Sequence, residues 1–188
     1  MSTVVITEVG SNTLERASKI LAGIPGGVQK AAWNAMRRAG QQAKTKAGQF
    51  ATAEYTISKG DFMRNVTNKI QMSGGGGGVA SVRILYAGSV LPLLTFNTKY
   101  SKSGAVSTQV KRSGSASVLQ HAFVAPVFGN TAVFERLGKS RFPVEQKYGP
   151  STAHMMQNEK VIEQMDKTIN EAFETRLDHE ITRLLNGW

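Results

Sequence analysis

The sequence predicts an α+β fold, in which an antiparallel sheet carries long N-terminal and C-terminal helices packed on one face and also bears extended hairpin loops. Two observations indicate this class: helical apolar repeats lie near both ends of the chain, and short strand-like segments fill the middle. The 188 residues suffice for one domain with an apolar core, and no long linker interrupts them. We therefore expect a single domain over residues 1–188.

The N-terminal third is predicted to be mainly helical. Residues 1–12 read as a strand or an extended arm, and a helix should begin near Asn12 or Thr13 and break at the Ile-Pro-Gly-Gly of 24–27. From Val28 to Phe50 apolar residues, mostly alanine, recur at helical spacing, so this helix should lie close against a sheet or another helix. Its other face is basic and carries Lys30, Arg37, Arg38, Lys44 and Lys46.

The middle of the chain should supply short strands. An extended piece at 55–57 precedes a short helix capped near Ser58, and strands are expected at 69–72 and 79–86. The glycines between these strands predict a flexible hairpin at 73–78. Because Pro92 cannot donate to a strand ladder, residues 89–96 should form an edge strand or an irregular strip. The stretch 97–117 is rich in Ser, Lys and Gly, which predicts a flexible, solvated hairpin loop with a strand at 106–111.

Two more strands and a corner lead into the last helix. The strands are expected at 122–126 and 131–136, followed by a basic turn and an extended piece that contains Pro143. Gly149, Pro150 and Ser151 should then turn the chain toward a long helix, whose apolar residues repeat from Val161 to Leu185 and which should stop at Gly187.

Composition limits the class of protein. The chain has no Cys, which excludes disulfides and thiolate chemistry. The N-terminus has neither the basic region nor the apolar run of a signal peptide. The longest nearly apolar run, 87–96, is about half of the roughly 20 residues that span a bilayer. We therefore expect a soluble protein without membrane contact.

The net charge of +10 is unevenly distributed. Residues 1–72 hold 10 basic and 4 acidic side chains, residues 73–150 hold 9 and 2, and residues 151–188 hold 4 and 7. A positive field of this kind favours polyanions or acidic neighbouring subunits. The acidic C-terminal part would also suit head-to-tail contacts between copies.

No motif predicts a catalytic residue, a cofactor or a metal. The pentaglycine lacks the Lys-Ser/Thr of a phosphate loop, and a strand rather than a helix follows it. His121, His154 and His179 lack metal-ligand spacing, and no carboxylate stands near Ser117 and His121 to complete a hydrolytic triad. The acids of the C-terminal helix are expected to form a solvated face or a docking face for a basic partner.

The candidate contact residues are basic. One group is Lys99, Lys102, Lys111 and Arg112, and the other is Arg136, Lys139, Arg141 and Lys147. Phosphate contact needs only accumulated positive charge, whereas base readout needs a recognition helix or stacking platform that the sequence does not show. Charge alone gives three alternatives for these loops: nonspecific contact with DNA, contact between subunits, and simple solvation.

The chain resembles the prophage minor tail protein Z family, most sharply at residues 122–125, 133–144 and 147–151. That family is related to the tail-completion and head–tail joining proteins of long-tailed phages. The resemblance extends over residues 14–188, with a helix of the 28–50 kind and the Tyr-Thr-Ile-Ser-Lys-Gly-Asp element at 55–61. It implies a structural virion protein without catalytic residues, and it includes Pro143, Gly149, Pro150 and Ser151 as the structural motif.

The resemblance also implies a role in bacteriophage virion assembly. Such a protein is expected to form a ring, a hexamer that matches the tail tube, at the neck-proximal end of the tail. Its partners would be the tail terminator or tail tube protein and the head connector or adaptor proteins, with genomic DNA passing through the lumen. It would reside in the virion tail or neck, and in the host cytoplasm during assembly. The alternative is a nonspecific basic nucleic-acid-binding protein.

Overall fold

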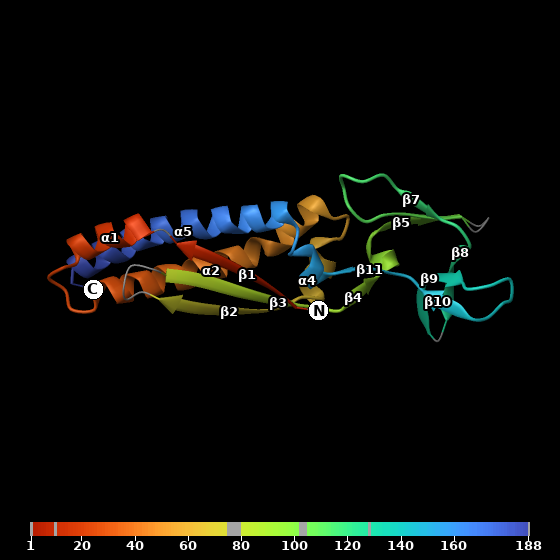
Figure 1. Cartoon of the computed structure of the whole chain (residues 1–188), viewed down its shortest axis with the longest axis horizontal. Coiled ribbons are helices and arrows are strands. Elements are labelled where there is room, and N and C mark those ends of the chain that lie inside the picture. The colour runs from red at the N-terminus through yellow and green to blue at the C-terminus, as the bar shows by residue number, and fades with distance from the viewer. Residues whose placement is uncertain (1, 10, 75–79, 102–104, 128, 188) are drawn as a thin grey trace. The chain divides into compact units, whose positions relative to one another are not determined.

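A computed structural model describes residues 2–9, 11–74, 80–101, 105–127 and 129–187 (Figure 1). The fold combines helices with several small sheets, which confirms the α+β class. The chain divides into two compact units. The helical unit comprises residues 2–47, 67–86 and 156–187, and the hairpin unit comprises residues 48–66 and 87–155.

The helical unit contains a three-stranded sheet and three helices. The sheet has the order β1-β3-β2, so the N-terminal segment is a strand of this sheet. Helix α1 begins at Ser11, and the Ile-Pro-Gly-Gly segment separates it from α2, with Gly26 at φ +69°. The elements are β1 (Ser2–Val9), α1 (Ser11–Ile20), most of α2 (Gly27–Glu54), β2 (Thr67–Gly74), β3 (Ala80–Ala87) and α5 (Glu159–Leu185).

Helix α2 lies close to the sheet because its inner stripe is made of small residues, as the sequence predicts. Its buried alanines are Ala31, Ala32, Ala35, Ala39, Ala43, Ala47 and Ala51. A Cβ on Gly40 would lie 3.1 Å from Cγ1 of Val82 and 3.2 Å from Cγ2 of Ile70, so this glycine allows the closest approach to β3 and β2. Side chains from the two strands thereby fill the space beside the helix.

Helix α5 packs on the same face of the sheet as α2. Its Asn158 cap accepts a hydrogen bond from the Lys160 N–H, and its inward residues include Met165, Ile169, Phe173 and Leu177. The Thr7 hydroxyl of β1 donates to Asp166 of α5. Two long helices therefore cover one face of a sheet, as expected, while Val4 and Ile6 on the opposite face of β1 are about half exposed.

The hairpin unit is built from α3 and short strands. Its three sheets are antiparallel, with orders β5-β6-β7, β10-β9-β8 and β11-β4. The elements are α3 (Lys59–Arg64), β4 (Val90–Pro92), the 3-10 turn η1 (Leu93–Thr95), β5 (Asn97–Tyr100), β6 (Val106–Gln109), β7 (Ser117–Leu119), β8 (Ala122–Val127), β9 (Asn130–Arg136), β10 (Val144–Gln146), β11 (Tyr148–Ser151) and α4 (Thr152–Met155).

The distribution of strands corrects the expectation of one antiparallel sheet. The described strands form four sheets of two or three strands each. Proline is one physical reason, because it cannot donate to a strand ladder. Pro92 ends β4 after three residues, and the register between β4 and β11 shifts between Gly149 and Ser151, where Pro150 stands.

The expected hairpin of 97–117 contains β5 and β6, and β7 begins at its end, at Ser117. Strand β6 lies within the strand expected at 106–111. Val106 and Thr108 are buried, so the β5–β6 hairpin has an inner face. Residues 102–104, and residues 75–79 of the expected glycine hairpin, lie outside the described residues. Among the helices that the structure describes, none is long and apolar enough to cross a membrane.

Candidate functional site

The first group of basic residues belongs to the β5–β6 hairpin and the turn that follows it. Lys99 is exposed on β5, where it stands opposite Ser107 of β6. Lys111 is exposed and forms an isolated antiparallel bridge with Tyr55 just after α2. Lys102 lies outside the described residues. The two described lysines are therefore presented to solvent by paired backbone.

Arg112 fastens this turn to the C-terminal end of α2. Its backbone N–H donates to the Glu54 carbonyl at 2.8 Å, and its Nε donates to the Thr52 carbonyl at 2.7 Å. Carbonyls in the last turn of a helix lack partners within the helix, so the two bonds satisfy groups that would otherwise need water. This anchoring role was not apparent from the sequence, because it depends on a contact between segments 60 residues apart.

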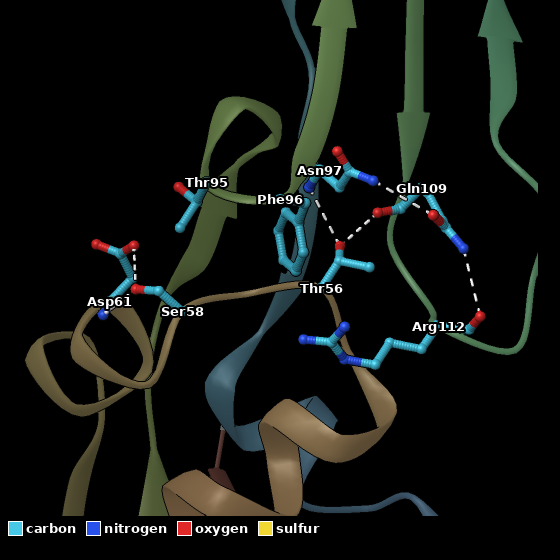
Figure 2. Close-up of a pocket in the computed structure, with 8 residues that line it drawn as sticks. All are labelled: Thr56, Ser58, Asp61, Thr95, Phe96, Asn97, Gln109 and Arg112. Atoms are coloured by element: carbon cyan, nitrogen blue, oxygen red, sulfur yellow. Dashed lines mark hydrogen bonds between the residues drawn. The ribbon is translucent and has the colours of Figure 1, made fainter.

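Arg112 also lines an open surface cavity of about 470 Å³, shown in Figure 2. The Thr56 hydroxyl stands in its wall, where it accepts a hydrogen bond from the Asn97 N–H at 3.2 Å and donates to the Gln109 carbonyl. These bonds hold the hairpin on the segment after α2. The cavity is lined by Thr56, Ser58, Asp61, Thr95, Phe96, Asn97, Gln109 and Arg112.

Ser58 and Asp61 form the N-terminal cap of α3 at the edge of this cavity. The Ser58 hydroxyl accepts from the Asp61 N–H at 3.0 Å and donates to Asp61 Oδ2 at 2.6 Å, and Arg64 forms an ion pair with the same carboxyl. The hydrogen bond from Ser58 is the main cause that lowers the pKa of Asp61 from its usual value, and the contact with Arg64 lowers it further. This carboxylate stabilises a helix start, as the predicted cap at Ser58 implies.

The second basic group lines a separate cavity of about 340 Å³. The Arg136 guanidinium lies 5.2 Å from the centre of the Phe123 ring, which is within the range of a cation–π contact. Phe123 stands opposite Phe134 across the β8–β9 pair. The pairing of β8 with β9 therefore holds the Phe123 ring where the Arg136 guanidinium contacts it. The lining residues are His121, Ala122, Phe123, Arg136, Gly138 and Lys139.

Arg141 and Lys147 have different surroundings. Arg141 lies 5.6 Å from the ring centre of the exposed Phe142. Lys147 forms ion pairs with Glu135 and Glu145, and the hydrogen bonds to these carboxylates raise its pKa. The ammonium of Lys147 is therefore engaged within the fold, whereas Arg141 presents charge next to an exposed aromatic ring.

The segment 143–151 sets the path of the chain from the basic turn into α4. The Phe142–Pro143 peptide is cis, and the Pro143 carbonyl accepts a hydrogen bond from the Leu137 N–H at 3.2 Å, which closes the basic turn. Gly149 lies against Phe96, and Ser151 caps α4 by accepting from the His154 N–H at 3.1 Å. Each described role is structural.

The structure does not gather the basic residues into one constellation. The cavity lined by Arg112 and the cavity lined by Arg136 and Lys139 have no residue in common. Within the part of the chain that the structure describes, no three His, Cys, Asp or Glu side chains are grouped to hold a metal ion. Distributed positive charge can support electrostatic contact but defines no reaction centre.

Sequence comparison identifies the family. The family model described as prophage minor tail protein Z (GPZ) matches residues 13–186, which is nearly the whole chain. Searches of curated proteins and of solved structures found no match. The matched region includes all but the first two residues of α1, the helices α2 to α5, both cavities and the corner at Gly149 to Ser151. The chain therefore belongs to the prophage minor tail protein Z family, a family of structural tail proteins of phages.

Proposed function

We propose that this protein completes the phage tail by forming a ring at its neck-proximal end, where it joins the tail to the head connector. The observation that carries the proposal is the family match over residues 13–186, which makes the chain a minor tail protein of the virion. A hexamer would match the symmetry of a tail tube, and the viral DNA would pass through its lumen. The proposed partners are the tail tube or terminator protein and the head connector or adaptor proteins.

The surface of the hairpin unit supports a docking role. Tyr100, Val118, Leu137, Phe142 and Tyr148 are each at least half exposed, on strands and turns of this unit. Exposed aromatic and aliphatic side chains beside arginine are typical of protein interfaces. Arg141 beside Phe142 is one such pair. These side chains would be covered when adjacent rings dock.

The test is a phage in which the gene is deleted and then supplied in trans. We expect the deletion to produce particles whose tails fail to join heads or to deliver DNA, and the supplied gene to restore plaque formation. Electron microscopy of purified particles should place the tagged protein at the head-proximal end of the tail. Normal joining and DNA delivery by the deletion phage would overturn the proposal.

The second candidate is nonspecific nucleic-acid binding by the free protein. The net charge of +10 and the cavity lined by Arg136 and Lys139 favour it. Duplex DNA should then bind the isolated chain tightly, and the affinity should fall steeply as salt rises. Weak binding by the free protein, together with incorporation into tails, would favour the tail-completion role.

A further inference from the structure

Helix α2 presents a basic face that no part of the described fold neutralises. Between Gly27 and Ala53 the helix has five cations and no acid. Among the described residues, none of the five has an ion-pair partner. Four of them are exposed, and Lys44 is half-buried; the set is Lys30, Arg37, Arg38, Lys44 and Lys46.

Three of the cations share one side of the helix. An α-helix turns by about 100° per residue, so side chains seven residues apart differ by only about 20° in direction. Lys30, Arg37 and Lys44 are seven apart, which places them about 10 Å from one another along the axis. They form a nearly straight basic row.

An exposed tryptophan lies beside this row. Trp33 is 45% exposed, three residues after Lys30 and four before Arg37. Tryptophan and arginine are the residues that most often anchor protein interfaces, since both supply large contact areas. The combination favours a protein partner that brings acidic side chains and also covers an aromatic ring.

Helix α5 provides the matching acidic face on the same unit. It has seven acids and four bases, and five of the acids are exposed: Glu159, Glu163, Glu171, Glu174 and Asp178. Glu159, Glu163 and Glu174 have no ion-pair partner among the described residues. Glu163 and Glu174 are eleven residues apart, about three helical turns, so they lie on one side of α5. This side of α5 can therefore face the basic row of α2 in another copy.

We infer that the basic face of α2 docks on the acidic face of α5 in a second copy of this chain. Seven of the chain's 13 acids lie on α5, whereas Glu135, Glu145 and Asp61 are already engaged with basic neighbours. No other element of this chain offers a comparable acidic row. The contact joins two different faces, so each copy keeps one face free for the next.

This inference rests on the proposed ring and identifies the surface that builds it. A heterologous contact of this kind closes into a ring when its rotation divides the circle, and otherwise extends as a filament. The charged faces would set the orientation of the contact, and it would cover Trp33. The contact is expected to weaken as salt rises.

Charge reversal tests the contact. One variant carries K30E, R37E and R38E, and the other carries E163K, E171K and E174K; all six positions are exposed. Sedimentation velocity of the full chain at low and high salt would measure self-association. We expect each variant alone to associate roughly ten-fold or more weakly than wild type, and an equal mixture to recover, because each supplies the face that the other has lost.

A matched control separates this contact from a general effect of net charge. The triple variant K59E, K69E and R83E makes the same change of charge at exposed positions on α3, β2 and β3, outside the two charged faces, and it should associate like wild type. Self-association that persists in both test variants would overturn the inference and leave the ring intact. Absence of wild-type association, in solution and in tails, would overturn both.

Disulfide trapping extends the test to assembled particles. The chain has no Cys, so an introduced pair reports one contact. Phage tails carrying R37C and E163C in each copy should yield covalent multimers on oxidation, and tails carrying R37C alone should not. If the basic face of α2 instead bound duplex DNA, K30E/R37E/R38E would lose DNA binding while self-association stayed unchanged, and the inference would be wrong.

Discussion

Gly149 of β11 lies directly against the ring of Phe96: a Cβ placed on Gly149 would be 2.4 Å from Cε2 of that ring. Phe96 is buried at the end of η1, and Gly149 pairs with Leu91 in the two-stranded sheet. The ring occupies the space that any larger residue would need. This contact holds the corner at 149–151 against the preceding strand.

The variant G149A should destabilise the protein by about 1–3 kcal/mol, because the added methyl group must push the buried ring aside. Urea unfolding followed by circular dichroism measures the change. The matched control is G138A, where an added Cβ would meet nothing within 4 Å. The same effect from both variants would show that backbone entropy, and not the Phe96 contact, is responsible.

The variant T56V should loosen the β5–β6 hairpin. It removes the hydroxyl that bonds the Asn97 N–H and the Gln109 carbonyl, which costs about 1 kcal/mol for a partly buried pair of bonds. Amide hydrogen exchange should quicken at Asn97. T45V, which removes a hydroxyl from the exposed face of α2, serves as the control and should leave exchange at Asn97 unchanged.

The variant D61N should lower stability at neutral pH but not in acid. The pKa of Asp61 is lower in the folded state than in the unfolded chain, so its contribution is fully present above the unfolded value of about 4 and is lost as the pH falls through the folded value. The loss at pH 7 should be about 1 kcal/mol or less, as is usual for a helix cap.

Urea midpoints for D61N and wild type, measured from pH 7 to pH 2, test this dependence. The two curves should converge at the acid end. E15Q, which changes an exposed carboxyl on α1, controls for the general effect of losing one negative charge. A difference between D61N and wild type that stays constant at every pH would contradict the capping role.

The variant Y86F should leave stability unchanged or raise it by up to about 1 kcal/mol. The Tyr86 hydroxyl is buried and has no hydrogen-bond partner among the described residues, and burial raises its pKa well above the usual value. Without the hydroxyl, the folded state no longer carries the unfavourable free energy of burying an unpaired polar group. Thermal unfolding compares Y86F with Y86L, which should be less stable because it also removes ring contacts.

The sequence predicted the helices better than the sheets. The alanine stripe of α2 and the apolar repeat of α5 have local periods, so both helices, their faces and the cap at Ser58 are confirmed. The grouping of strands depends on pairings between distant segments, such as Gly149 with Leu91, which no local pattern encodes. The division into four small sheets was therefore missed.

At the candidate site, too, the sequence predicted local groupings of residues but not contacts between distant segments. Arg136 and Lys139 are close in sequence and line one cavity, as a local reading suggests. The bonds of Arg112 to the end of α2, and those of Thr56 to Asn97 and Gln109, join segments 40 to 60 residues apart. Polar residues in such contacts have no periodic signature.

The alanine stripe of α2 limits which positions of this helix can change during evolution. A stripe of methyl groups has little volume to give up, and within it an added Cβ on Gly40 would already crowd Val82 and Ile70. Inherited substitutions should therefore accumulate on the outward residues of the helix. Relatives that assemble with different neighbours are expected to keep the alanines while changing Lys30, Trp33 and Arg38.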